Sequence, residues 1–301
     1  MDKLIKIIEE VDIRLDKYLI DYLPEMTRTQ IQQMIENEEI LVNNKPTKPS
    51  YKLRVNDEVV VKYVEPKTLD IKSEEIPLDI YYEDSDLIVV NKPTGMVVHP
   101  AFGNYEGTLV NALMHHCKDL STINGVIRAG IVHRIDKETS GLLVACKNDF
   151  THKNLSKQFS SKTVTRKYIA IVHGVINHNL GRVDAPIGRS KEDRKLMAIV
   201  EEGKHAATNF KVIERFKDHT LLELSLETGR THQIRVHMKY IGFPVVGDPQ
   251  YGLRKDKSNY GQYLHAKTLG FIHPRTNEYM EFNSPLPDYF LEYLDEIIAN
   301  E

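Results

Sequence analysis

Hydrophobic side chains near the start of the chain recur at the spacing of a helix. Leu15, Tyr18, Leu19 and Tyr22 would share one helical face, and Pro24 would end that helix. A helix of this kind buries one side and exposes the other, so the beginning of the chain is expected to fold onto a small core.

A second helix and a small sheet are predicted to follow. Thr27 with Gln30 forms a capping box, and the buried face of the helix behind it is apolar, with Ile31, Met34 and Ile35. Residues 40–43 and 58–61 read as strands. These elements predict a separate small α/β domain over residues 1–64, followed by a charged linker without periodicity over residues 65–76.

Strands dominate the pattern from residue 77 to 301. Strands are expected over residues 78–82, 87–91, 142–146, 167–172, 207–216 and 220–227. Two helices interrupt them: one begins with Asp149 as its N-cap and reaches Phe159, and the other runs from Thr231 to Ile241. Many strands with a few flanking helices are typical of an α+β domain.

Composition places the chain among ordinary globular proteins. It has 301 residues, of which 41% are hydrophobic, and no apolar run is long enough to span a membrane. The first residues lack the apolar core and cleavage site of a signal peptide, so a cytoplasmic location is expected. Cys117 and Cys146 are the two cysteines, which predicts neither a disulfide framework nor a Cys-x-x-Cys site.

The charge is unevenly distributed along the chain, although its net value is only −3. Residues 127–195 carry 14 Lys and Arg against 6 Asp and Glu, a net charge of +8. Residues 271–301 carry 1 basic and 7 acidic residues, a net charge of −6. This separation predicts one basic face that suits a phosphate backbone.

The segment from His133 to Leu143, with sequence HRIDKETSGLL, carries the candidate chemistry. Arg134 and Asp136 stand at the mouth of a buried strand without joining an amphipathic pattern. Taken alone, such a pair is most often a solvated ion pair of little consequence. Three further segments change that interpretation: Lys92 to Pro100, Arg166 to Gly174, and Thr228 to His237.

Together these four motifs resemble those of the RluA/RluD family of RNA pseudouridine synthases, over about residues 76–285. The resemblance implies a catalytic domain over residues 77–301 built on a mixed, mostly antiparallel sheet flanked by helices. It implies that Asp136 acts on the nucleoside while the base is detached, that Tyr168 stacks on the uracil, and that Arg134 fills the gap left by a flipped base. Ile135 replaces the usual leucine, which conserves volume.

Asp136 must be ionised to act, but a pocket of the size of a base would desolvate its carboxylate and raise its pKa. The resemblance pairs it with Arg235, and the local pattern agrees, because Thr231 would place Arg235 about one turn into a helix. His133, His99, Lys92 and Arg230 are candidates for either phosphate contact or structural pinning. Whether the aspartate adds to the base, attacks the sugar or assists elimination stays open.

The first 64 residues resemble the S-four RNA-binding domain. Its expected RNA contacts are basic, with Arg14, Arg28 and Lys45 as the candidates. Two glycine positions common in that family are replaced, one in the Glu38-Glu39 turn and one by Asn44, which tolerates the left-handed conformation. The other interpretation of this domain is a stabilising appendage, since 14 acidic residues outnumber 11 basic ones through residue 70.

Other classes of protein fit the sequence less well. Among 13 histidines, neither His115-His116 nor His232 with His237 has the carboxylate partner of a metal site, so no metal is expected. Phosphate-loop, dinucleotide-binding and Gly-x-Ser-x-Gly patterns are absent, so no nucleotide cofactor is expected. A non-catalytic RNA-binding protein would be expected to lack Asp136, Tyr168 or Arg235.

The sequence therefore predicts a cofactor-free and metal-free pseudouridine synthase that acts on structured RNA as a monomer. Because an RNA-binding domain precedes the four motifs, the branch that modifies large-subunit ribosomal RNA is the favoured match, with transfer RNA as the alternative.

Overall fold

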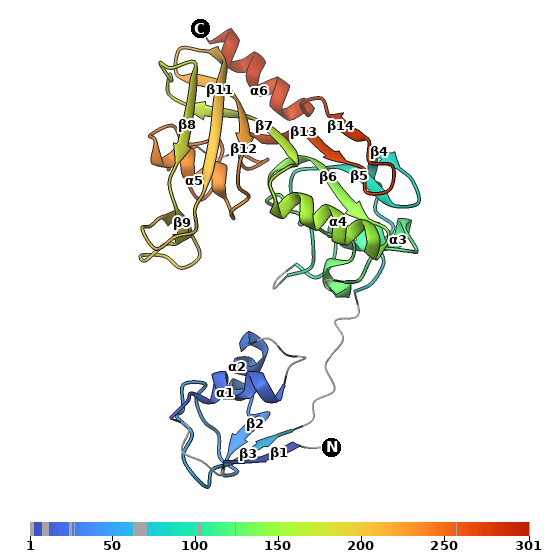
Figure 1. The fold of residues 1–301 in the computed structure, drawn as a ribbon. Coiled ribbons are helices and arrows are strands. Elements are labelled where there is room, and N and C mark those ends of the chain that lie inside the picture. The colour runs from blue at the N-terminus through green and yellow to red at the C-terminus, as the bar shows by residue number, and fades with distance from the viewer. Residues whose placement is uncertain are drawn as a thin grey trace. The chain divides into compact units, whose positions relative to one another are not determined.

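The computed structural model describes residues 3–7, 12–23, 26, 28–62, 71–101, 104–123, 125–256 and 258–300. The chain forms two compact units, residues 1–70 and 71–301, each with its own core (Figure 1). The predicted linker of residues 65–76 needs correction at its end. Residues 71–76 belong to the second unit, because Ile71 is buried in its core and Asn111 Nδ2 donates to the carbonyl of Lys72. Residues 65–70 lie outside the described part.

The first unit packs two helices on a three-stranded sheet. The helices are α1 (Leu15–Tyr22) and α2 (Arg28–Glu36), and the strands are β1 (Lys3–Lys6), β2 (Ile40–Val42) and β3 (Glu58–Val61). All pairings in the order β1-β3-β2 are antiparallel. Both helices and the two later strands match the sequence prediction, whereas β1 was not expected. The predicted capping residue Thr27 and Pro24 lie outside the described residues.

Left-handed backbone occurs at both turns where glycine is replaced. Asn44 has φ 58° and Glu38 has φ 59°. Asparagine tolerates this conformation well and glutamate less well, so the Glu38 turn carries some strain. The predicted tolerance at Asn44 is confirmed.

The second unit contains a nine-stranded sheet with helices on both faces. Its helices are α3 (Leu109–His116), η1 (Val126–Arg128), α4 (Asp149–Ser160), α5 (Gln233–Tyr240) and α6 (Asp288–Ala299). Its sheet strands are β4 (Asp79–Glu83), β5 (Leu87–Lys92), β6 (Ser140–Cys146), β7 (Thr165–His173), β8 (Leu180–Asp184), β11 (Ala207–Arg215), β12 (His219–Leu226), β13 (Leu264–Ile272) and β14 (Tyr279–Asn283). A separate hairpin is formed by β9 (Ile187–Arg189) and β10 (Met197–Ile199).

The sheet is mixed and mostly antiparallel, as predicted. Its order is β4-β5-β6-β13-β7-β12-β11-β8, with β14 added beside β13. Only β6 and β13 run parallel among the described pairings. Their contact is close at Gly141, where φ is +122° and a Cβ would lie 2.3 Å from the carbonyl oxygen of Ala266. Gly141 therefore permits the close approach of β6 to β13.

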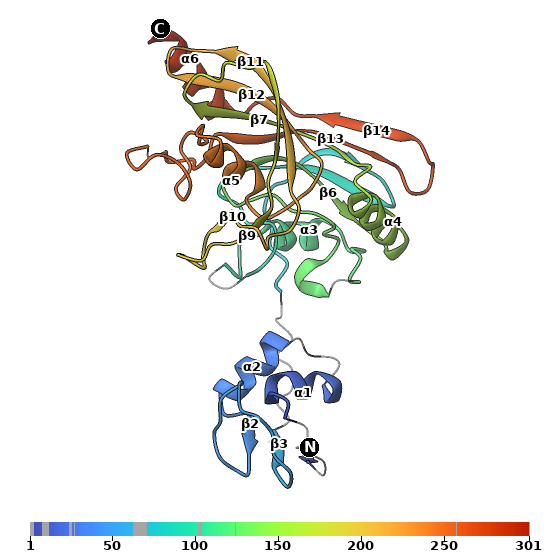
Figure 2. The ribbon, with the colours of Figure 1, turned by 60° about the vertical axis from the view of Figure 1, so that its left-hand side comes forward.

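Alternation along the strands divides the core between the two faces of the sheet. In β5, Ile88 and Val90 belong to the large core that also contains residues of α3 and α5, whereas Leu87 and Val89 belong to the core that contains Leu155 of α4. The face of β7 opposite to α3 and α5 packs against α6 through Ile171. Figure 2 shows α3 and α6 on opposite sides of the sheet. No helix in the described residues is both long enough and apolar enough to cross a membrane.

Two predicted helix starts were wrong by one residue. The N-cap of α4 is Asn148 rather than Asp149, because the Asn148 side chain accepts a hydrogen bond from the backbone of Thr151. The N-cap of α5 is His232 rather than Thr231, and its backbone is left-handed with φ 54°. Several elements were not predicted at all: β8, β9, β10, β13, β14, α3 and α6.

Candidate active site

A cavity of about 580 Å³ opens in the second unit. Its walls come from the loop before β6, the end of α4, the start of β7 and the loop that leads into α5. Six of the predicted site residues line it: His133, Arg134, Asp136, Tyr168, Arg230 and Arg235. Lys92 and His99 are not among its lining residues.

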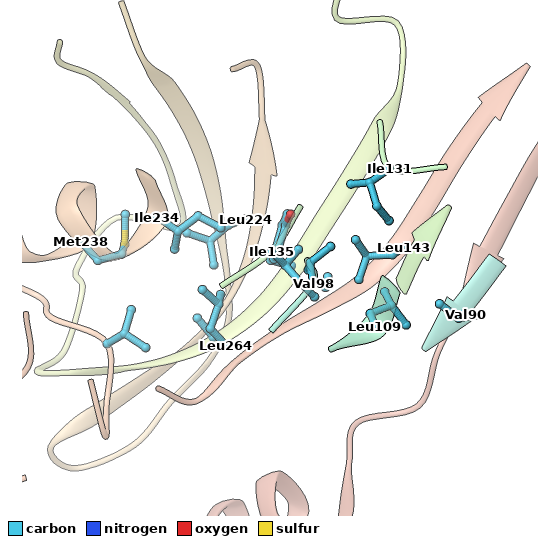
Figure 3. Close-up of a cluster of buried hydrophobic side chains, with 14 of the residues drawn as sticks. Val90, Val98, Leu109, Ile131, Ile135, Leu143, Leu224, Ile234, Met238 and Leu264 are labelled. Carbon is cyan, nitrogen blue, oxygen red and sulfur yellow. The ribbon is translucent and has the colours of Figure 1, made fainter. Parts of the chain in front are cut away.

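Ile135 attaches the loop that carries Asp136 to the core of the second unit. This side chain is 8% exposed and belongs to the large core beneath the cavity. Figure 3 shows it among Leu224, Ile234 and Leu264, which come from β12, α5 and the start of β13. Arg134, Ile135 and Asp136 all line the cavity, and the burial of Ile135 in this core holds the loop at the cavity wall.

Asp136 and Arg235 form the ion pair that the sequence predicted. Arg235 Nη1 donates to Asp136 Oδ2 at 2.8 Å. The arginine side chain is 2% exposed and the aspartate side chain 23% exposed, so the carboxylate reaches the cavity while the guanidinium is enclosed. The guanidinium therefore holds one oxygen of the Asp136 carboxylate in place at the cavity wall.

A second carboxylate holds the same guanidinium. Arg235 Nε and Nη2 donate to the two oxygens of Asp248 at 2.6 and 2.8 Å, and Asp248 is fully buried. Burial lowers the pKa of Arg235, but the hydrogen bonds and charges of Asp248 and Asp136 outweigh it and raise the pKa above its usual value. Sequence reasoning missed Asp248. The signal that could have found it is an aspartate directly after the apolar run Pro244-Val245-Val246-Gly247.

Tyr168 lies on β7 with its side chain in the core face that adjoins the cavity. It is 8% exposed, and burial is the main cause that raises the pKa of its hydroxyl, with the charge of Asp136 acting in the same sense. A neutral phenol ring at the wall of a cavity offers a flat surface to a planar ligand.

Arg134 and Arg230 are the two predicted cationic residues whose guanidinium groups line the cavity without a carboxylate partner among the described residues. Arg134 is exposed, and its Nη2 donates to Thr231 Oγ1 at 3.2 Å. Arg230 donates through Nε to the carbonyl of His205 at 2.9 Å. Neither forms an ion pair within the described residues.

His133 and Lys92 act as structural pins. His133 Nε2 accepts the backbone N–H of Val144 at 3.0 Å, and burial together with Arg166 lowers its pKa to about 3, so the ring is neutral. Lys92 is 1% exposed, and its Nζ donates to the carbonyls of Pro93, Met96 and Lys137 at 2.8 to 3.0 Å. Burial lowers the pKa of Lys92, while Glu138 and Asp136 act in the opposite sense.

His99 is half-buried outside the cavity. Burial, Arg128 and Arg134 lower its pKa, and its buried Nδ1 has no hydrogen-bond partner among the described residues. Of the two roles predicted for His133 and Lys92, pinning therefore fits the geometry. For His99 the structure describes neither role.

His232 is a further cavity residue that the sequence did not single out for this purpose. Its Nε2 lies 3.9 Å from Asp136 Oδ1, and its Nδ1 lies 2.8 Å from the hydroxyl of Tyr251. Because that hydroxyl accepts the backbone N–H of Met197, its own proton is available to Nδ1 of the histidine. This arrangement leaves Nε2 of a neutral ring as a donor toward Asp136.

The three basic residues proposed for the first unit have different environments. Arg14 and Arg28 both bind Asp16, which is fully buried, at 3.0 and 2.8 Å. Burial raises the pKa of Asp16, but hydrogen bonds from Arg14, Gln32 and Arg28 lower it to about 2. Lys45 is exposed in the turn after β2. The arginines keep 41% of their side-chain surface exposed, so a fixed pair of cations faces solvent.

Two clusters of three potential metal ligands occur among the described residues, both outside the cavity. One consists of Glu83, His116 and Cys117, and the other of Asp84, Asp86 and His273. The carboxylates of both already bind protein partners, including Lys147 and Arg275. The chemistry that the cavity itself can supply is a paired carboxylate, an aromatic face and a cationic rim.

Comparisons with known proteins point to one family. The family described as RNA pseudouridylate synthase matches residues 86–240, and the S4 domain matches residues 13–59. An RNA pseudouridine synthase of Bacillus subtilis (strain 168), YlyB, is 56% identical over 292 residues, which cover 97% of this chain and 96% of the relative. Ribosomal large subunit pseudouridine synthase D of Zymomonas mobilis is 44% identical and covers 93% and 92%.

A solved structure agrees with these matches. Human RNA pseudouridylate synthase domain containing 1 superposes with a TM-score of 0.61 at 28% identity, over 78% of this chain and 90% of that one.

Proposed function

Because this chain belongs to the RNA pseudouridine synthase family, we propose that it isomerises uridines of large-subunit ribosomal RNA and that Asp136 performs the chemistry. The observation that carries the proposal is the geometry of Asp136. One of its oxygens is held by a buried guanidinium, while the side chain remains 23% exposed at the wall of the cavity.

The reaction needs neither redox chemistry nor an energy source. The bond between nitrogen 1 of uracil and the ribose breaks, the base turns, and carbon 5 forms the new bond to the sugar. A proton leaves carbon 5 and one is gained at nitrogen 1, so the atoms balance. The carboxylate of Asp136 interacts with the nucleoside while the base is free, and the ring of Tyr168 holds the base by stacking.

The cavity requires the uridine to leave its stack. Arg134 stands exposed at the rim and is held on one side by Thr231. We assign to it the filling of the gap that the flipped base leaves. Flipping costs a few kcal/mol and less for unpaired nucleotides. Arg134→Ala is therefore expected to lower kcat/KM about tenfold or more for a paired target uridine, and less when the partner base is changed to leave that uridine unpaired.

Two features support ribosomal RNA as the substrate. Relatives at 44% and 43% identity carry the name ribosomal large subunit pseudouridine synthase D. The first unit adds a second cationic surface, where Arg14 and Arg28 are oriented by Asp16.

The test is the release of tritium from RNA labelled at carbon 5 of uridine. Ribosomal RNA and transfer RNA are isolated separately from a strain that lacks the gene, and each is incubated with the protein. Tritium release is expected from large-subunit ribosomal RNA. In Asp136→Asn the rate of release is expected to fall by a factor of about a thousand or more. Asp184→Asn, outside the cavity, serves as the matched control.

Each possible result bears on one part of the proposal. No release from ribosomal RNA would refute the substrate, and release from transfer RNA alone would replace it. Release by Asp136→Asn at the control rate would refute the role of the aspartate.

A further inference from the structure

Arg166 lines the same cavity as Asp136 and has no counter-charge among the described residues. It precedes Tyr168 by two residues on β7, so both side chains lie on one face of the strand. No hydrogen bond or ion pair joins its guanidinium to any residue that the structure describes. Its Nε is buried and has no hydrogen-bond partner in the part of the chain that the structure describes. A buried donor without an acceptor costs free energy, so this guanidinium is arranged for a ligand.

Neighbouring groups hold the guanidinium in place without neutralising it. Its central carbon lies 5.7 Å from the centre of the Phe159 ring, and that ring in turn stacks on His133 at 4.4 Å. On another side, the backbone of Gly229 approaches so closely that a Cβ there would lie 2.8 Å from Arg166 Nη1. These contacts fix orientation and leave the charge free.

The charge of the cavity wall selects an anion. Its lining includes Arg134, Lys162, Arg166, Arg230 and Arg235. Asp136 is the one carboxylate among the described lining residues, and Arg235 already pairs with it. The field of Arg166 is also one cause of the lowered pKa of His133. An uncharged uracil would leave this excess unbalanced.

We propose that Arg166 binds a phosphate of the RNA backbone beside the target uridine. This inference rests on the proposed function, because it requires RNA to enter the cavity. Guanidinium presents paired donors that match two phosphate oxygens. Its separation from Tyr168 along the strand, about 7 Å, is comparable to the size of one nucleotide, so one strand can offer a base to Tyr168 and a phosphate to Arg166.

The test compares Arg166→Gln with the wild type on the ribosomal RNA that the wild type modifies, over a range of salt concentrations. KM is expected to rise about tenfold while kcat changes little, because a phosphate contact positions the strand. The slope of log(kcat/KM) against log salt is expected to become shallower by about 0.7, which corresponds to one lost contact on single-stranded RNA.

Arg182→Gln is the matched control. Its guanidinium is half-exposed and already bridges Asp184 and Glu227, so the salt slope is expected to stay unchanged. Arg166→Lys keeps the charge but not the paired donors, so it is expected to retain the slope and part of the affinity. Equal urea midpoints for the three variants and the wild type exclude a folding defect.

A second pair of variants tests the position of the guanidinium. Gly229→Ala should displace Arg166 and raise KM severalfold in the wild type. In Arg166→Gln the same change is expected to have little further effect, because the group that it displaces is gone. Additive effects of the two substitutions would overturn the proposal.

Two other results would also overturn it. An unchanged KM in Arg166→Gln would mean that no contact was lost, and a raised KM with an unchanged salt slope would place the contact on the base. If the wild type does not modify ribosomal RNA, the proposed function fails by itself. Fluorescence anisotropy with a labelled single-stranded RNA then measures the same slopes, and equal slopes for Arg166→Gln and wild type would refute this inference independently.

Discussion

Arg235 and Asp136, which are 99 positions apart in the chain, are joined by one hydrogen bond of 2.8 Å, whereas Arg235 binds Asp248 through two. Asp248 therefore fixes the orientation of the guanidinium through Nε and Nη2, and Nη1 donates to Asp136. Asp248 itself accepts the backbone N–H groups of Gln250 and Tyr251, both at 2.9 Å. The position of the Asp136 carboxylate thus depends on a residue that does not line the cavity.

Replacing Asp248 with asparagine is expected to impair both folding and turnover. The amide group of asparagine would face a donor of Arg235, and this buried ion pair would lose its geometry. We expect the free energy of unfolding to fall by about 3 kcal/mol and kcat to fall more than KM rises. Urea unfolding and tritium release measure the two effects. Gln250→Ala removes only one neutral acceptor at 3.1 Å and serves as the milder comparison. A normal kcat in Asp248→Asn would contradict the positioning role.

The variant Lys92→Met tests which of the two predicted roles Lys92 has, a structural role or contact with a phosphate. The ammonium group connects the loop of Pro93 and Met96 to Lys137, next to Asp136. Without it, three carbonyls lose their donor, and we expect a loss of about 3 kcal/mol in the free energy of unfolding. The salt dependence of RNA binding is expected to stay the same, because Lys92 is 1% exposed. A shallower salt slope would show that Lys92 reaches a phosphate after all.

Stability of the second unit is expected to fall with acidification below pH 6.5. Burial lowers the pKa of His133 to about 3 and that of His265 to about 4, with Arg166 and Lys267 adding to the respective shifts. Since both values lie below that of an unfolded histidine, the unfolded chain binds protons first as the pH falls. Each histidine then contributes a loss of about 1.4 kcal/mol per pH unit.

Urea unfolding at pH 7, 6 and 5 measures this dependence. In His133→Asn, the slope of the free energy of unfolding against pH is expected to decrease by the contribution of about one proton. His178→Asn, at an exposed position, is expected to leave this slope unchanged. An unchanged dependence in His133→Asn would mean that this ring is protonated in the folded protein.

Removal of residues 1–65 is expected to weaken RNA affinity more than it slows turnover of bound RNA. The truncated protein keeps Ile71, which belongs to the core of the second unit, so that unit should fold. Dissociation constants from anisotropy and single-turnover rates at saturating protein give the two quantities. Asp16→Asn in the full chain tests the same surface, because it releases Arg14 and Arg28. Unchanged affinity in both variants would assign the first unit a purely stabilising role.

The elements that sequence predicted are those whose signal is local. Periodicity placed α1 and the strands of residues 87–91 and 142–146 within a few residues of their observed bounds. Strand β13 was not predicted, because its polar residues interrupt the alternation of hydrophobic and polar positions. In the structure this strand lies between β6 and β7 and joins the two halves of the sheet. Motif resemblance supplied the Asp136–Arg235 pair, which the structure confirms as a contact.

The sequence by itself determined two domains, an α+β sheet and part of the set of residues that bring charge to one cavity. Only the tertiary structure decided what those charges do. Lys92 is enclosed by carbonyls, Asp248 shares Arg235, and Arg166 has no counter-charge within the described ranges. None of this is visible from neighbours in the chain. The physical reason is that hydrophobic periodicity is a property of adjacent residues. Burial and charge pairing, by contrast, depend on which distant segments the fold brings into contact.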